Sequence, residues 1–256
     1  MPFYWQRYRM SRLTTLYRST LGKKAIVAVT GIMLFGFVVM HMIGNLKTLT
    51  GNDAEGIPHI DTYAHFLRTM GAPMLPEGFA LWGARIILLI ALVLHLVTVT
   101  QLTLQNYAAR PIAYTRKVYV QTTITARSML VSGILLLIFI VLHILHFTTG
   151  TIDITPIVPE TVYANLYYAF SEWYIAFFYV LAMGVLGLHV YHGVWSLFQT
   201  LGLDNPDRNR GLLRMAAASA IILVLGFCSV PVLIQFRFLP APTQVSTPID
   251  ELAGGH

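Results

Sequence analysis

Long apolar stretches recur five times along the chain, with polar connections between them. They cover residues 24–46, 79–104, 129–149, 172–202 and 213–236. Each reaches the length of about 20 apolar residues that an α-helix needs to cross the hydrocarbon core of a bilayer. The pattern therefore predicts an all-α membrane protein with five transmembrane helices.

A shorter pattern of a different kind follows the first stretch. Apolar side chains recur there at helical spacing, opposite Asp61 and Arg68, at Ile60, Tyr63, Phe66, Leu67 and Met70. This periodicity predicts an amphipathic helix in the plane of the outer interface. Beyond Phe238 the chain has few apolar anchors, so residues 1–238 are expected to form one transmembrane domain and residues 239–256 a mobile tail.

The composition supports a membrane location, and the charges orient the helices. The chain is 56% hydrophobic and 11% charged, with a mean hydropathy of +0.65. Cations gather before the first stretch, between the second and third, and between the fourth and fifth, which the positive-inside rule assigns to the cytoplasm. We therefore expect the N-terminus inside and the C-terminus outside, in a bacterial cytoplasmic membrane. The net charge of +6 then indicates anionic lipids or an acidic cytoplasmic partner, with no role for nucleic acid.

Six histidines lie inside the apolar stretches, in four of the five. They are His41, His95, His143, His146, His189 and His192. Ionisable groups within a membrane mark functional sites by default. Helices that each present an imidazole form a suitable cage for haem iron, because neutral imidazole is a good axial ligand. The lone Cys228 excludes covalent attachment through CxxCH, so any haem would be of the b type.

Helix rise gives the depth of each histidine. His41 and His143 lie ~25 and ~24 Å from the cytoplasmic starts of their helices. His95 and His189 lie ~18–20 Å from the cytoplasmic ends of theirs. The first two match at a level nearer the outside, and the other two match at a level nearer the cytoplasm. The sequence thus predicts a four-helix core around two stacked bis-histidine haems.

Two further histidines leave the ligand assignment open. His146 and His192 each follow a depth-matched histidine by three residues, on the same face of a regular helix. Spacing alone allows either member of each doublet to bind iron. Two other histidines, His59 and His65, lie in the exterior amphipathic segment, where a solvated or interfacial ring is expected.

Several of these segments together resemble one known family. The segments run from Gly22 to Phe37, from His41 to Leu46, from Tyr63 to Arg68, from His143 to Gly150 and from His189 to Gly202. In order and spacing they are similar to the cytochrome b anchor of succinate:quinone oxidoreductases, in the branch with one polypeptide, five helices and two haems. The resemblance covers about residues 19–215.

The resemblance implies ligands, partners and a direction. Gly193 follows the expected ligand of the fourth stretch by four residues, which selects His189 over His192, and a glycine ten residues upstream selects His143 over His146. An FAD flavoprotein and an iron–sulfur subunit would dock in the cytoplasm, and a membrane quinone, expected to be menaquinone, would accept the electrons. Some fumarate-reducing relatives carry a glutamate where this chain has Gly187, which favours succinate oxidation.

Two charged residues near the second stretch are candidates for supporting roles. Glu77, at its outer mouth, could supply protons to the quinone, with Asn45 and Lys47 behind it. A solvated loop carboxylate is an equally good interpretation of Glu77. Arg85, just inside the same stretch, could pair with a haem propionate or extend to the interface.

Two alternative functions remain open. One is the dihaem cytochrome b anchor of another quinone-linked enzyme, a hydrogenase or a formate dehydrogenase. The other is a transporter whose histidines relay protons. The transporter class usually has internal repeats or broken helices, which the sequence does not display, and it would give no haem spectrum.

Overall fold

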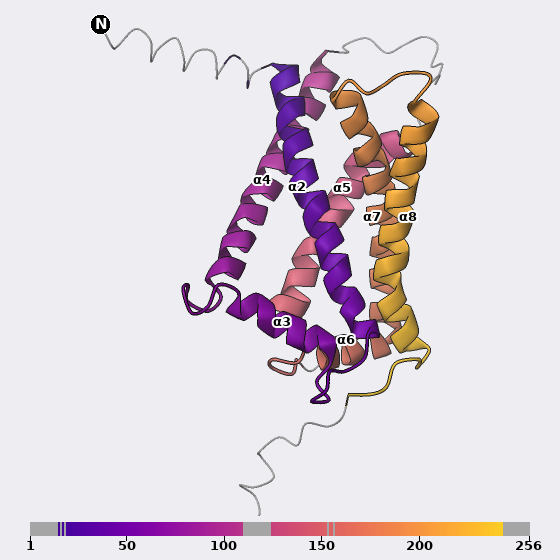
Figure 1. Cartoon of the computed structure of the whole chain (residues 1–256). Coiled ribbons are helices and arrows are strands. Elements are labelled where there is room, and N and C mark those ends of the chain that lie inside the picture. Colours follow the sequence, from indigo (N-terminus) through magenta and orange to yellow (C-terminus); the bar gives the residue numbers. More distant parts are fainter. Residues whose placement is uncertain are drawn as a thin grey trace, which may run out of the picture.

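A computed structural model describes residues 15, 17, 19–109, 124–152, 154, 155 and 157–242, with side chains left out at 124–128. Five of its helices are long and apolar enough to cross a membrane, which confirms the predicted all-α membrane architecture (Figure 1). They are α2 (Thr20–Leu46), α4 (Phe79–Ala108), α5 (Ile124–His143), α7 (Trp173–Thr200) and α8 (Asn209–Gln235).

The helices extend beyond the apolar stretches at the end that the charge pattern assigns to the cytoplasm. Four start or stop several residues outside the predicted bounds there, and α7 alone stops short, at Thr200. Backbone hydrogen bonding continues past the apolar core, because polar side chains are compatible with helix at the headgroup level. Ser19 fixes the start of α2, since its hydroxyl accepts a hydrogen bond from the Gly22 N–H at 2.9 Å. Such a cap satisfies a backbone donor that has no partner within the helix.

Two short helices lie at the opposite end of the molecule from the start of α2 (Figure 1). The amphipathic segment forms α3 (His59–Thr69), as predicted, and Figure 1 shows it across the lower ends of the long helices. The second, α6 (Val162–Ser171), was not predicted. The Asp61 carboxylate of α3 accepts hydrogen bonds from the Val162 and Tyr163 N–H groups at 2.6 and 2.9 Å. A side chain a hundred residues upstream therefore caps the start of α6.

The long helices pack as two pairs and a fifth helix. Helix α2 lies along α4, α5 lies along α7, and α8 packs against both α7 and α2. The order of elements in the two pairs is the same: a long helix, a short helix at the end opposite the start of α2, then a second long helix (Figure 1). This repeated order was not recognised in the sequence.

One turn of the third span departs from α-helical geometry. Residues Ile144–Thr148 form a π-helix, η2, directly after His143, and the Thr149 N–H reaches back to the Ile144 carbonyl at 3.0 Å. A π-turn contains more residues than an α-turn, so each residue advances by a smaller angle. His143 and His146 are consequently farther apart around the helix axis than regular α-helical spacing predicts, although both rings still reach the Tyr179 hydroxyl.

The C-terminal segment is described only as far as residue 242. The Tyr163 hydroxyl of α6 donates to the Pro240 carbonyl at 2.8 Å, so the chain contacts α6 just after α8 ends. The rest of the expected tail, residues 243–256, lies outside the described residues.

Candidate cofactor site formed by two histidine pairs

The inner pair consists of His95 on α4 and His189 on α7. The two rings lie close enough for their charges to interact, although the residues are far apart in the sequence. Both rings are half-buried. The structure thus brings together the two histidines that were matched by depth.

A hydroxyl on the neighbouring helix holds each inner histidine. Thr30 Oγ1 lies 3.1 Å from His95 Nδ1, and Ser132 Oγ lies 3.1 Å from His189 Nδ1. Each hydroxyl has a single proton. Thr30 donates it to the Ile26 carbonyl at 2.7 Å, and Ser132 donates it to the Met129 carbonyl at 3.0 Å.

These hydrogen bonds link the tautomer of each inner ring to its hydroxyl. When the hydroxyl donates to the carbonyl of its own helix, its oxygen accepts from the histidine, so Nδ1 carries the hydrogen in both rings. The lone pair is then on Nε2, which is the form that binds a metal. A glycine follows each hydroxyl residue, and a Cβ built at Gly31 or Gly133 would lie 3.6 Å from Cε1 of His95 or His189, respectively.

The outer pair consists of His41 on α2 and His143 on α5. Their ring centroids are 5.9 Å apart with an interplanar angle of 77°. Phe37 stacks on His41 at 5.4 Å, and Phe139 stacks on His143 at 5.7 Å. Aromatic side chains therefore restrict both rings and give the pair an apolar surround.

The two remaining intramembrane histidines differ from each other. His146 is buried, with 4% of its surface exposed, and both ring nitrogens have partners: Tyr179 Oη at 3.3 Å and Thr155 Oγ1 at 3.3 Å. His192 is half-buried and lies near His189. With both nitrogens occupied, His146 is less suited to metal binding than His143.

The separation of the outer pair fits a bis-histidine haem. Bonds between imidazole nitrogen and zinc, a comparable metal, are about 2 Å long, so two axial imidazoles on one iron have centroids about 6 Å apart. The outer pair has nearly this separation. Among the described residues no three His, Cys, Asp or Glu side chains cluster as a metal site. A porphyrin supplies four nitrogens itself and needs only two protein ligands.

Glu77 and Arg85 lie on the exposed surface near the start of α4. Glu77 belongs to the loop before the helix and is exposed. Arg85 is also exposed, and its guanidinium lies 4.9 Å from the centroid of the Trp82 ring. Asn45 and Lys47 were predicted to lie behind Glu77. Asn45 donates to the His41 carbonyl at 2.8 Å, and the Lys47 ammonium lies 5.5 Å from the Tyr63 ring centroid.

The polar partners of the histidines were not predicted from the sequence. These are Thr30, Ser132, Thr155 and Tyr179. A signal was present for two of them, since Thr30 and Ser132 each stand eleven residues before an outer histidine and directly before a glycine. The partners of His146 come from a different helix and a loop, so local spacing gives no indication of them.

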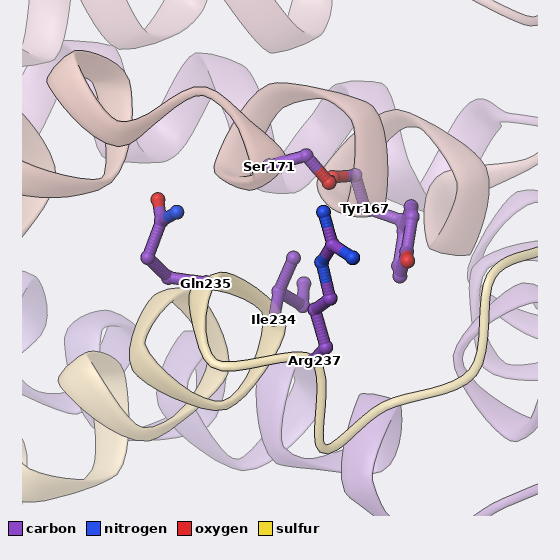
Figure 2. A pocket seen from close by; sticks show the side chains of 5 residues that line it. All are labelled: Tyr167, Ser171, Ile234, Gln235 and Arg237. Atoms are coloured by element: carbon purple, nitrogen blue, oxygen red, sulfur yellow. The ribbon is translucent and has the colours of Figure 1, made fainter.

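A polar cavity lies apart from the histidines, at the outer ends of α6 and α8. Its volume is about 320 Å³, and its lining consists of Tyr167, Ser171, Ile234, Gln235 and Arg237. Figure 2 shows the Arg237 side chain extending toward Tyr167 and Ser171. The Gln235 Oε1 atom is buried without a hydrogen-bond partner. None of the six intramembrane histidines lines this cavity.

Comparisons with family models, with curated proteins and with solved structures gave no match. The geometry of the site and the resemblance of the sequence segments are therefore the grounds for a functional assignment.

Proposed function

We propose that this chain is the membrane-anchor cytochrome b of a succinate:quinone oxidoreductase and carries electrons through two b haems to a quinone. One observation carries the proposal: His41 and His143, from two different helices, lie with their ring centroids 5.9 Å apart, and His95 and His189, from two others, lie within electrostatic range of each other. His95 and His189 would hold the inner haem, and His41 and His143 the outer one. Bound haem would supply one-electron redox chemistry.

The residues of the chain contribute position and electrostatics. Thr30 and Ser132 hold the inner imidazoles in the metal-binding tautomer, which is the usual task of partners behind a ligand. Phe37 and Phe139 stack on the outer imidazoles and restrict their orientation. Dicarboxylate chemistry would take place on the flavoprotein partner.

The distribution of charge supports a cytoplasmic protein partner. Thirteen of the seventeen cations, but only Asp204 and Asp207 of the eleven acidic residues, lie on the sides assigned to the cytoplasm. A surface of this kind attracts an acidic protein face as well as anionic lipid. The iron–sulfur subunit, with the FAD flavoprotein behind it, would bind here.

The first test is the haem content of the purified chain. Pyridine haemochrome analysis should give two non-covalent haems per polypeptide. The substitution His189→Ala should reduce this to one haem, because it removes an inner ligand. His192→Ala, the matched control, should retain both. One haem or none in the unaltered protein would overturn the proposal, and loss of a haem in the His192 variant alone would reverse the ligand assignment.

The second test concerns the quinone, which we place near the outer haem with Glu77 as its proton donor. Positioned general acids contribute about 10²–10⁴-fold to rate, so Glu77→Gln should lower quinone-linked turnover by roughly 10²-fold. Both haem spectra and succinate oxidation with an artificial acceptor should be unchanged. Glu55→Gln, in the same outer loop and also exposed, is the control. Full quinone activity in the Glu77 variant would remove this residue from the site.

A further inference from the structure

A chain of hydrogen bonds leads from the outer histidine pair toward the outer loop. His143 Nδ1 lies 3.4 Å from Tyr179 Oη, and the same oxygen lies 3.3 Å from His146 Nδ1. His146 Nε2 lies 3.3 Å from Thr155 Oγ1. The proposed function uses only the first member, His143, as a ligand.

The members of this chain of hydrogen bonds beyond His143 are shielded from water. Tyr179, His146 and Thr155 have 8%, 4% and 5% of their surface exposed. Buried polar atoms that lose their partners carry a desolvation penalty, so the protons of such a chain are arranged to satisfy every donor. The position of one proton therefore constrains all the others.

Counting donors gives two consistent arrangements. Tyr179 has one hydroxyl proton and can donate it to only one of the two histidines. When it donates to His146 Nδ1, His146 carries its hydrogen on Nε2 and donates to Thr155, and His143 Nδ1–H donates to the Tyr179 oxygen. His143 Nε2 is then free to bind a metal. When the hydroxyl proton points to His143 instead, the hydrogen of the neutral His143 ring lies on Nε2, and that nitrogen cannot be a ligand.

From this linkage we propose that His146 is a positioning residue for the outer haem: it accepts the Tyr179 proton and thereby holds His143 in the metal-binding tautomer. The inference rests on the proposed function, because it presupposes a haem on His41 and His143. It also gives the second histidine of the His143-Ile-Leu-His146 doublet a role distinct from ligation. The inner pair uses hydroxyls of Thr30 and Ser132 for the same purpose.

The experiment compares variants that break the chain of hydrogen bonds with one that preserves it. His146→Leu and Tyr179→Phe should each weaken retention of the outer haem by about 10- to 100-fold, the usual effect of losing a partner behind a metal ligand. His146→Gln should restore retention, since its carbonyl can accept from Tyr179 while its amide donates to Thr155. His192→Leu alters the corresponding residue of the other doublet and is the control.

Retention is measured by titrating the haem-depleted chain with haem and following the absorption and electron paramagnetic resonance signals of the two sites separately. An unchanged signal from the inner haem would show that each variant is folded. Wild-type retention and an unchanged outer signal in His146→Leu would overturn the inference, and so would failure of His146→Gln to restore what His146→Leu loses. Absence of haem from the unaltered chain would instead overturn the proposed function.

Discussion

At the scale of single residues, Asp61 connects two outer segments of the protein. Its carboxylate accepts from two N–H groups at the start of α6. Burial raises the pKa of Asp61, and this outweighs the two backbone donors and Arg68, which lower it. The folded state therefore favours the protonated form of the Asp61 side chain more strongly than the unfolded chain does.

This sign leads to a prediction for Asp61. A raised pKa contributes stability that is fully present below the pKa of the unfolded chain and is lost as pH rises through the folded value. Asp61→Asn retains an accepting oxygen without the charge, so at pH 7 it should be at least as stable as the original. Asp61→Ala loses the cap and should cost about 1 kcal/mol. Thermal unfolding in detergent at several pH values measures both. An Asn variant as unstable as the Ala variant would show that the charge itself is required.

The residues of the candidate site could be predicted from the sequence only in part. Matching by depth paired His41 with His143, whose ring centroids lie 5.9 Å apart, because helix rise is constant and the charges mark where the helices end. The hydrogen-bond partners could not be obtained in this way. Tyr179 reaches His143 and His146 from another helix, and which side chains meet across helices depends on rotation about each axis.

At the scale of helices, the contact between α7 and α8 depends on a glycine. A Cβ at Gly187 would lie 2.5 Å from Val224 Cγ2 and 3.9 Å from the Ala220 carbonyl. A Cβ at Gly184, one turn earlier on α7, would meet nothing within 4 Å. Small residues of this kind let helices approach closely within a membrane.

Gly187→Ala should therefore destabilise the protein by about 1–3 kcal/mol through overpacking. Gly184→Ala should be neutral or should stabilise by up to about 1 kcal/mol, because alanine favours the helix. The thermal midpoints of the two variants provide the comparison. Equal midpoints would mean that α8 shifts without cost and that the contact is not tight.

The five long helices could be predicted from the sequence because the length of an apolar stretch determines them. Helices that depend on contacts with distant segments could not be predicted in this way. The five spans follow from lipid as the solvent. Helix α6 was missed since its first N–H groups depend on Asp61, far away in the chain. The π-turn at Ile144–Thr148 was also missed, because the apolar pattern through His143 is compatible with a regular α-helix.

At the scale of the whole molecule, the five spans of the described part of the chain place the start of α2 and the end of α8 on opposite sides of a membrane. We predict the connection between α7 and α8 to be cytoplasmic and the segment before α3 to be outside. Single cysteines at Asn205 and Glu55, in a Cys228→Ser background, would test this with an impermeant thiol reagent. In intact cells Glu55→Cys should react and Asn205→Cys should react only after lysis. The reverse pattern would invert the topology and place the cationic side outside.

The repeated order of long, short and long helices has a consequence for how the molecule is held together. One half runs from α2 to α4 and the other from α5 to α7, and each histidine pair takes one ring from each half. A metal bound by either pair is thus a cross-link between halves that otherwise meet mainly through α2, α7 and α8. By mass action, a ligand at 100 times its dissociation constant adds about 2.7 kcal/mol to the folded state. Cofactor supply would then govern how long the assembled protein survives quality control in the membrane.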